Sequence, residues 1–342
     1  MLVADESMVL HLSPGFYPKV EGTPLRANEQ FAVGALGQQV IIGHSDAGWY
    51  ERAIPKLRSF IPRVSRFKGG EAHVKCEQCV DGDNDKWETI DVAGKRVCLT
   101  IRLNDGNDIQ TLLMAADMIE RCGGESTAFF PYVPYARQDK AFLEIEPFSL
   151  EVFARQINSA GFKRVYYVDP HSVVTPALIK NSKVISNYDF IKKVLERMYP
   201  VFGVNASDLV LVGPDNGAYK KFPDLMKAVG GAFDTGFGAK CRTVATMNID
   251  KQVFVGDVED KDALMIDDIC DGGRTFIGLA KILKEQGARR IFLAVTHGIF
   301  SYGFDVFDEY FDGLFCTDSI QSEYDSITPA GKNLPIVLPL SL

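Results

Sequence analysis

The run of residues 263–275, ALMIDDICDGGRT, constrains the fold of this chain more than any other stretch. Its mostly apolar start, 263–266, predicts a buried strand, and two adjacent carboxylates, Asp267 and Asp268, follow where that strand should end. A glycine-bearing turn, 271–275, then opens a segment with helical spacing of Phe276, Leu279, Ala280 and Leu283. Strand, turn and helix N-terminus together predict an anion site, because unpaired N–H groups and the positive end of the helix dipole face the ligand.

Two carboxylates beside an anion site indicate a phosphorylated polyol, with the acids on its hydroxyl groups and the loop on its phosphate. Many strand-to-helix turns contain Asp and Gly without binding anything. The adjacent pair is harder to explain in that way, because neighbouring carboxylates repel each other. The run resembles the ribose-phosphate binding loop of type I phosphoribosyltransferases, in which two acids and a short glycine loop follow a hydrophobic strand.

The size and charge of the chain are those of a globular protein with two domains. A length of 342 residues allows two cores, and 46% hydrophobic with 24% charged residues is an ordinary composition. The 37 Lys and Arg against 45 Asp and Glu give a net charge of −8, which disfavours nucleic acid and anionic membranes as partners. The seven cysteines are scattered, as is common in a reducing compartment. The sequence shows neither a basic signal region at its start nor an apolar run of roughly 20 residues. These features together predict a cytoplasmic protein.

Strand-like and helix-like runs alternate along the chain, which predicts an α/β fold with mainly parallel sheets flanked by helices. Expected strands are 40–42, 96–101, 126–132, 164–168, 209–212, 263–266 and 290–294. Expected helices are 109–121, 149–160, 189–198 and 276–286. The strand–helix–strand order occurs twice, which predicts an N-terminal domain (39–186) and a C-terminal domain (187–329). Residues 1–38 are expected to form an N-terminal extension, and residues 330–342 are expected to join the N-terminal domain.

Polar loops follow several of the predicted strands. They are the turn YARQDK (135–140), the tripeptide DPH (169–171) and the turn GPDNG (213–217). Ligands of open parallel sheets gather beyond the carboxyl ends of the strands, and Arg and Gln side chains can hold a nucleotide through planar hydrogen bonds. Each loop alone could be a solvated tip. Together with the run at 263–275 they predict one binding site.

A further segment, 236–243, places two cations one residue apart, Lys240 and Arg242. On a strand they would point to the same side, because side chains alternate. On a glycine-bearing loop they could fold over a polyphosphate and neutralise the charge of a transferring phosphoryl group. The alternative is a solvated hairpin.

Taken in order, these motifs resemble the ribose-phosphate pyrophosphokinase (PRPP synthetase) family. The resemblance runs from about Phe67 to Ile320 through the motifs FKGGE, PYVPYARQDK, VDPHS, GPDNG, KCR, IDDICDGGRT, VTHGIFS and CTDSI. It implies two domains with the type I phosphoribosyltransferase fold. It also implies a reaction in which the 1-hydroxyl of ribose 5-phosphate attacks the β-phosphorus of ATP, so that 5-phosphoribosyl 1-diphosphate (PRPP) and AMP form.

The resemblance assigns roles to the matching residues on the nucleotide side of that reaction. The ATP-binding residues would be Phe67, Glu71, Arg137, Gln138 and His171, the first two reached from a neighbouring subunit of a homo-oligomer. Mg²⁺ would be positioned with the ATP by His171 and Asp215. Lys240 and Arg242 would be the catalytic cations that stabilise the transition state.

On the acceptor side, the resemblance assigns the ribose hydroxyls to Asp267 and Asp268. The 5′-phosphate would be held by Asp271, Gly272, Gly273, Arg274 and Thr275. The family pattern for this loop is Asp-Thr-Gly-Gly-Thr, so Gly272 removes a hydroxyl and Arg274 replaces a glycine.

Arg274 keeps a second acceptor open. In a tight phosphate site the Arg274 side chain either points away from the ligand or meets further negative charge, such as the diphosphate of ADP-ribose. With ADP-ribose as the acceptor, the product would be ADP-ribose pyrophosphate for NAD synthesis. A third interpretation is a catalytically silent regulatory relative, which would be expected to lose Lys240 or Arg242. Gly69 stands where the family usually has an acid or Asn that contacts adenine, which predicts relaxed base selectivity. The departures after His171 and near Leu342 leave the oligomeric state and allosteric control open.

Overall fold

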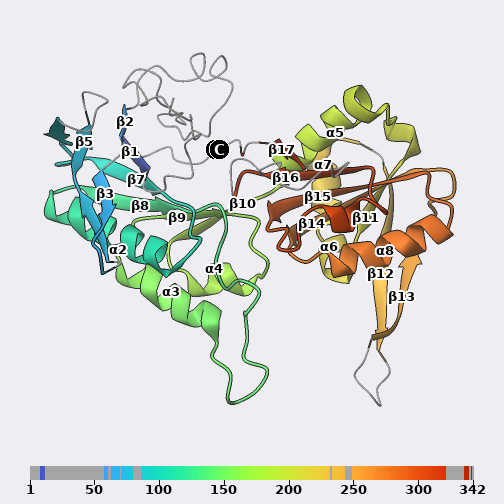
Figure 1. Cartoon of the computed structure of the whole chain (residues 1–342), viewed down its shortest axis with the longest axis horizontal. Coiled ribbons are helices and arrows are strands. Elements are labelled where there is room, and N and C mark those ends of the chain that lie inside the picture. Colours follow the sequence, from blue (N-terminus) through green and yellow to red (C-terminus); the bar gives the residue numbers. More distant parts are fainter. Residues whose placement is uncertain are drawn as a thin grey trace. The chain divides into compact units, whose positions relative to one another are not determined.

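The computed structural model describes residues 8–11, 58–60, 63–69, 71–79, 86–231, 233–242, 249–320, 335–338 and 340. The chain divides into two compact units, of which the first ends at Ile185 and the second begins at Ser186. Each unit is built around its own sheet (Figure 1).

Six described strands form the sheet of the first unit, in the order β10-β9-β8-β7-β1-β2. All their pairings are parallel. The strands are β1 (Met8–His11), β2 (Arg58–Phe60), β7 (Arg96–Thr100), β8 (Glu125–Phe129), β9 (Val165–Val168) and β10 (Ser182–Ile185). The helices that accompany them are α2 (Gly106–Arg121), α3 (Ser149–Ser159) and α4 (Val174–Leu178).

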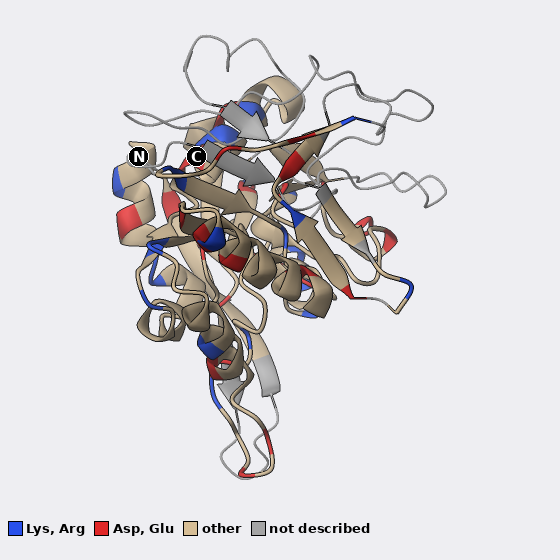
Figure 2. Cartoon of the chain, turned by 90° about the vertical axis from the view of Figure 1, so that its left-hand side faces the viewer, with Lys and Arg blue, Asp and Glu red and all other residues tan. Residues whose placement is uncertain are grey.

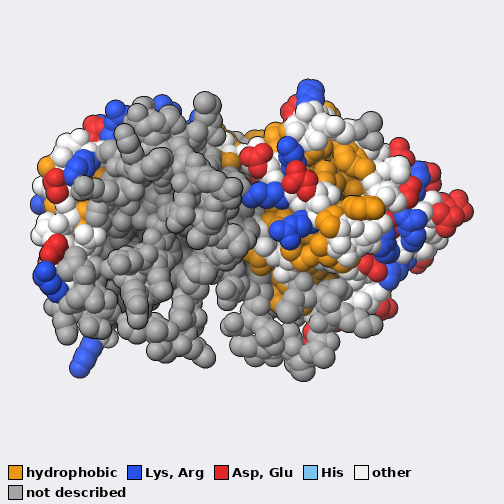
Figure 3. Space-filling model, turned by 90° about the horizontal axis from the view of Figure 1, so that it is seen from above, with side chains coloured by type: hydrophobic (Ala, Val, Ile, Leu, Met, Phe, Trp, Pro, Cys, Tyr) orange, Lys and Arg blue, Asp and Glu red, His pale blue; other side chains and the backbone are white. Residues whose placement is uncertain are grey.

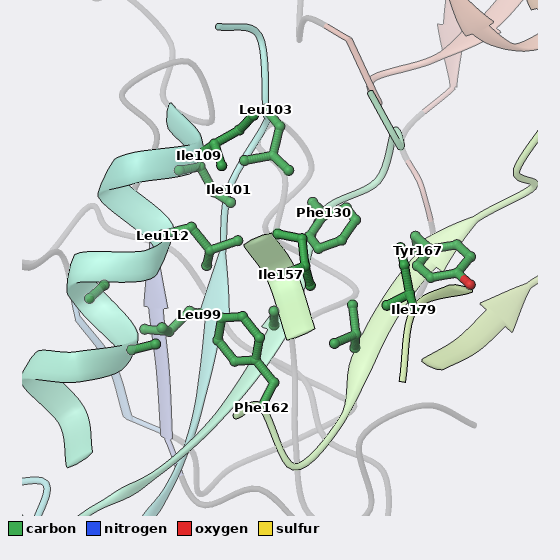
Figure 4. Packing of buried hydrophobic residues seen from close by; sticks show 14 of the residues in the cluster. Leu99, Ile101, Leu103, Ile109, Leu112, Phe130, Ile157, Phe162, Tyr167 and Ile179 are labelled. Atoms are coloured by element: carbon green, nitrogen blue, oxygen red, sulfur yellow. The ribbon is translucent and has the colours of Figure 1, made fainter. Parts of the chain in front are cut away.

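The core of the first unit lies between its central strands and the helices α2 and α3. Leu99 and Ile101 from the sheet side pack with Ile109 and Leu112 of α2 and with Ile157 of α3 (Figure 4). Helix α2 begins with a reciprocal capping box: the Asp105 carboxylate accepts from the Asp108 N–H, and the Asp108 carboxylate accepts from the Asp105 N–H. The cap fixes where the helix starts, which brings its apolar stripe onto the sheet.

Two small hairpins belong to the first unit. The strands β3 (Arg63–Arg66) and β4 (Ala72–Lys75) pair antiparallel, as do β5 (Glu77–Cys79) and β6 (Trp87–Thr89).

Seven described strands form the sheet of the second unit, in the order β13-β12-β11-β14-β15-β16-β17. They are β11 (Leu209–Gly213), β12 (Asp234–Arg242), β13 (Ile249–Val255), β14 (Asp262–Cys270), β15 (Arg290–Gly298), β16 (Gly313–Thr317) and β17 (Ile336–Leu338). Only β12 and β13 pair antiparallel among these strands, as a long hairpin. The helical segments are α5 (Tyr188–Phe202), η2 (Ala206–Asp208), α6 (Asn216–Tyr219), α7 (Phe222–Val229), α8 (Arg274–Glu285) and η3 (Asp305–Phe307).

The central strand β14 is buried on both faces of the second sheet. Ala263 and Met265 pack in the cluster that contains the apolar side of α8, while Leu264 and Ile266 pack in the cluster that contains α5 and α7. This division follows from the alternation of side chains along a strand. A continuous apolar strand is typical of a parallel sheet with helices on both faces.

The predicted fold class is confirmed, with two details changed. Strand β14 extends to Cys270, four residues beyond the expected end at Ile266, because its backbone continues to pair with β15. Residues 330–342 were expected to join the first domain, but Ile336–Leu338 pair with β16 of the second sheet. Within the expected N-terminal extension, Met8–His11 form a strand beside β7. The expected strand 40–42 lies outside the described residues.

Positions of both charge signs are mixed along the part of the chain that faces the viewer in Figure 2. In that view, ribbon segments coloured for Lys and Arg alternate with segments coloured for Asp and Glu on helices and loops. Figure 3 shows apolar side chains interspersed with charged ones on the face of the second unit where α5 lies; on that helix Tyr199 is 67% exposed.

Candidate functional site

The predicted acid pair lies in the last third of β14, at the carboxyl edge of the second sheet. Asp268 is buried, and Asp267 is partly buried. Alternation along the strand places Asp268 on the face of Leu264 and Ile266, which is the face covered by α5 and α7. The two carboxylates therefore have different neighbours.

A lysine that the sequence analysis did not single out accompanies the buried acid. Lys221, the residue before α7, places its Nζ 3.6 Å from Oδ2 of Asp268. The lysine side chain is 45% exposed and that of Asp268 only 7%. A buried carboxylate requires a counter-charge or hydrogen bonds to stay ionised, and Lys221 supplies a positive charge from the solvent side.

Asp267 has the more perturbed carboxyl group. Burial raises the pKa of the Asp267 carboxyl well above its usual value, and the negative charges of Asp268 and Asp215 raise it further. The backbone N–H of Asp268, which donates to Asp267 Oδ1 at 2.9 Å, and the charge of Lys221 act in the opposite direction. A carboxyl group with a perturbed pKa at the end of a strand is typical of a functional site.

An open pocket borders the acid pair within the second unit. It encloses about 280 Å³ of empty space, including space open to solvent. It is lined by Asn187, Tyr188, Ala218, Lys221, Phe222, Leu225, Ile266, Asp267 and Asp268. The pocket is apolar at the helices and charged at the strand end, so a ligand there would meet the carboxylates and the ammonium group together.

The predicted phosphate loop follows β14 directly, and α8 begins at Arg274. Gly273 is the residue before that helix, with a φ of 75°, and a Cβ at this position would lie 2.6 Å from the ring of Phe307. Only glycine satisfies both conditions, because other residues rarely adopt positive φ and have no room here. Asp271, Gly272 and Thr275 are partly exposed and Arg274 is exposed, so the loop faces solvent.

Asp215 follows β11 and begins the short helix α6. Its Oδ1 accepts the backbone N–H groups of Gly217 at 2.8 Å and Ala218 at 3.0 Å. This N-cap fixes the carboxylate at the carboxyl edge of the same sheet that carries the acid pair. Both Asp215 and Asp267 therefore come from strand ends of one unit.

In the first unit, the loops after β8 and β9 are held together by a side-chain hydrogen bond. Ser172, which is buried, donates its hydroxyl to Asp139 Oδ2 at 2.6 Å. The bond joins the turn that carries the exposed Arg137 and Gln138 to the tripeptide that ends in the exposed His171. The structure thus brings together two of the loops predicted to bind ATP. His171 and Asp215, predicted to position Mg²⁺, belong to different units.

The predicted catalytic cations lie on the β12–β13 hairpin. Lys240 pairs with Gln252 and Arg242 with Ile249, and the register shifts between Cys241 and Arg242. The side chains of Lys240 and Arg242 lie outside the described residues, so their expected common orientation stays a prediction.

The predicted nucleotide loop at Phe67 and Glu71 is the turn between β3 and β4. The Phe67 N–H donates to the Glu71 carbonyl at 2.9 Å, and the Phe67 ring lies 5.2 Å from that of His73. Phe67 is 58% exposed, which leaves its ring available to a ligand. That a neighbouring subunit uses this turn stays a prediction.

The described part of the chain contains no group of three or more His, Cys, Asp or Glu side chains arranged to hold a metal ion. No described helix is both long and apolar enough to cross a membrane.

Comparisons with known proteins agree on one family. The family model of the phosphoribosyl synthetase-associated domain matches residues 243–325. The ribose-phosphate pyrophosphokinase of Ureaplasma parvum is 28% identical over 233 residues, which cover 67% of this chain and 68% of that protein. The ribose-phosphate pyrophosphokinase of Thermosipho africanus is 31% identical over 245 residues, 70% of this chain and 71% of that protein.

The chain belongs to the ribose-phosphate pyrophosphokinase family. Its relatives are enzymes that transfer a diphosphate group, which supports the predicted transferase type. The fold agrees with the crystal structure of phosphoribosylpyrophosphate synthetase from Mycobacterium smegmatis, with a TM-score of 0.66 at 23% identity, over 83% of this chain and 87% of that one.

Sequence analysis missed two residues that this pyrophosphokinase-family member places at its site. Lys221 stands next to another lysine in the sequence, and no spacing distinguishes the two. Ser172 lies beside His171, but only the fold shows that its hydroxyl reaches Asp139. A sequence signal for either would have required knowing which loops meet.

Proposed function

We propose that the protein transfers the β,γ-diphosphate of ATP to the 1-hydroxyl of ribose 5-phosphate, yielding PRPP and AMP. One observation carries this proposal. Two carboxylates near the end of β14 are followed directly by a glycine loop and the N-terminus of α8. This order suits a sugar with hydroxyl groups at one end and a phosphate at the other. The names of the relatives support the same acceptor.

On the acceptor side, Asp267 and Asp268 accept hydrogen bonds from the ribose hydroxyls. The 5′-phosphate is held by Asp271, Gly272, Gly273, Arg274 and Thr275, with the backbone N–H groups at the start of α8 as donors. Lys221 places a positive charge beside Asp268. These groups orient the 1-hydroxyl without any covalent step on the protein.

On the nucleotide side, Arg137, Gln138 and His171 bind ATP, and Phe67 and Glu71 of a neighbouring copy complete the site. Lys240 and Arg242 stabilise the charge that develops on the phosphates during transfer, which is the main task in phosphoryl-transfer catalysis.

The donor set fits Mg²⁺ as the ion bound with ATP. Magnesium prefers oxygen ligands and needs only one or two carboxylates beside substrate phosphates, and Asp215 offers a carboxylate held in place by α6. We infer that Asp215 holds the ion and that His171 helps to position the Mg²⁺-bound nucleotide. The ion, when bound, neutralises charge on the phosphates.

Activity with each acceptor tests the proposal. Purified protein with Mg²⁺-ATP should release AMP in proportion to added ribose 5-phosphate, and faster than with ADP-ribose at equal concentration. AMP release in the absence of both acceptors would contradict an acceptor-dependent transferase. No turnover under any condition would instead favour a silent regulatory relative.

A variant of the hairpin separates catalysis from binding. Lys240→Ala should lower kcat by roughly 100-fold or more, the scale seen when one charge-stabilising donor is removed. The dissociation constant for ribose 5-phosphate should stay unchanged, because the lysine is assigned to the transition state. Turnover close to that of the parent protein would remove Lys240 from the catalytic role.

A further inference from the structure

Tyr302 is held beside the phosphate loop by hydrogen bonds from the three residues that precede it. Ser301 donates its hydroxyl to Asp271 Oδ1 at 2.6 Å. The backbone N–H groups of Ile299 and Phe300 both donate to the Cys270 carbonyl, at 2.8 Å and 3.2 Å. The turn after β15 is therefore fixed to the start of the loop, and Tyr302 moves with it.

The Tyr302 ring occupies the space above Gly272. A Cβ placed on Gly272 would lie 2.9 Å from Cε2 and 3.1 Å from Cδ2 of that ring. Cβ atoms in proteins do not approach other atoms to 2.9 Å, so a side chain at 272 and the ring in its present place exclude each other. Gly272 does not have a positive φ, so the backbone itself would tolerate another residue.

The exposure of Tyr302 sets it apart from its aromatic neighbours. Its side chain is 66% exposed, whereas Phe300, Phe304 and Phe307 in the same segment are buried at 5%, 7% and 0%. The phenylalanines form the core beneath the loop, while Tyr302 lies on the solvent side. A tyrosine offers a flat apolar ring and a hydroxyl donor, a combination that suits a wall of a polar binding site.

We propose that Tyr302 is a specificity-determining residue that forms one wall of the acceptor's phosphate subsite and donates its hydroxyl to a phosphate monoester. The Tyr302 ring fills the space that a side chain at position 272 would occupy, because Gly272 has no side chain. The inference rests on the proposed function, because it assigns the ligand of this loop as the 5′-phosphate of the acceptor. The chemistry follows from the position: a phenol donor beside the glycine turn and the N-terminus of α8 adds to the N–H donors directed at an anion.

Binding measurements test Tyr302 without requiring turnover. Calorimetric titration with ribose 5-phosphate should show a dissociation constant raised roughly tenfold or more in Tyr302→Phe, which loses only the hydroxyl bond to a charged group. Tyr302→Ala should bind ribose 5-phosphate more weakly still. Ribose without phosphate should bind the parent and both variants alike. Tyr199→Phe, on α5, is the matched control, because Tyr199 is exposed to the same degree, 67%.

A double-mutant cycle tests the relation between the ring and Gly272. Gly272→Ala should displace the exposed ring and weaken ribose 5-phosphate binding. Adding it to Tyr302→Ala should weaken binding less than the sum of the two single effects, because both act by removing the ring from the loop. Additive effects would overturn the proposed exclusion.

The outcomes separate this inference from the proposed function. If the parent protein binds ribose 5-phosphate and Tyr302→Phe and Tyr302→Ala bind it equally well, the Tyr302 assignment is wrong and the acceptor assignment stands. If the parent protein binds no ribose 5-phosphate, both fail.

Discussion

Lys221 Nζ lies 3.6 Å from Oδ2 of Asp268, a carboxylate that is 7% exposed at the end of a buried strand. Lys221 is the residue immediately before α7, so the position of that helix determines where the ammonium group lies relative to Asp268. An ionised carboxylate is the stronger hydrogen-bond acceptor for a sugar hydroxyl, and a nearby cation favours the ionised state.

Removing the Lys221 charge should therefore weaken the acceptor site. Lys221→Ala is expected to raise the KM for ribose 5-phosphate about tenfold, equivalent to ~1.4 kcal/mol, and Lys221→Arg should restore most of it. A structural role alone would lower stability without selective loss of acceptor binding. Steady-state kinetics on the three proteins make the distinction.

The matched control is Lys227→Ala. Lys227 also pairs with an aspartate, Asp224, but both side chains are more than two-thirds exposed, at 78% and 71%. Exposed pairs of this kind contribute ~0–1 kcal/mol, so neither KM nor stability should change noticeably. An equal effect of both variants on KM would argue against a specific role for Lys221.

Asp267 should make the protein more stable at acidic than at neutral pH. Its folded-state pKa is raised above the unfolded value of 3.8, so the folded state binds the proton more tightly. The free energy of unfolding contributed by this group falls as pH rises from the unfolded pKa through the raised folded pKa. Asp267→Asn should therefore exceed the parent in stability at neutral pH, with the difference shrinking as the pH is lowered.

Chemical denaturation across a pH series without ligands measures this effect. Asp305→Asn, at an exposed aspartate in η3, is the control for the loss of one negative charge. A constant difference between Asp267→Asn and the parent across the series would contradict the raised pKa.

A buried anchor lies at the other end of β14. Asp262, at 0% exposure, accepts hydrogen bonds from Arg289 and Arg290 at 2.7 Å to 3.0 Å. Asp262→Ala should lower the free energy of unfolding by about 1.5–3 kcal/mol, because it removes the charge-assisted hydrogen bonds from two partly exposed guanidinium groups to a buried carboxylate. Asp257→Ala, which breaks an exposed pair with Lys261, should cost much less, because solvent screens that pair. Equal losses would show that burial of Asp262 is not what matters.

The hydrogen bond between Ser172 and Asp139 should affect nucleotide binding. Ser172→Ala releases the tripeptide of His171 from the turn of Arg137, so the KM for ATP should rise while that for ribose 5-phosphate does not. Ser159→Ala, whose hydroxyl bonds to its own helix, is the control. A rise in both KM values would indicate general loosening of the first unit instead.

Sequence reasoning found the fold because its signal is local. Alternation of apolar strands and amphipathic helices predicted both sheets, and the glycine turn predicted the start of α8. It ended β14 too early at Ile266, because a polar residue at a strand end looks like a loop until the pairing partner, β15, is known. It placed 330–342 with the first domain, whereas Ile336–Leu338 pair with the second sheet, because the partner of a short strand is a long-range property.

The candidate site was predicted only in part, because its loops carry a local signal whereas the contacts between them do not. Loops beyond strand ends are recognisable by their polar residues, and these placed Asp215 and the acid pair on one sheet edge. The groups that tune them, Lys221 and Tyr302, come from elements that follow other strands. Their roles depend on distances that no sequence period encodes.

The fate of the β-phosphorus of ATP tests the central claim most directly. Protein incubated with Mg²⁺, ribose 5-phosphate and ATP labelled at the β-phosphorus should yield a sugar product that carries the label, and AMP that does not. Label recovered in ADP, or a sugar that receives only the γ-phosphate, would contradict diphosphate transfer.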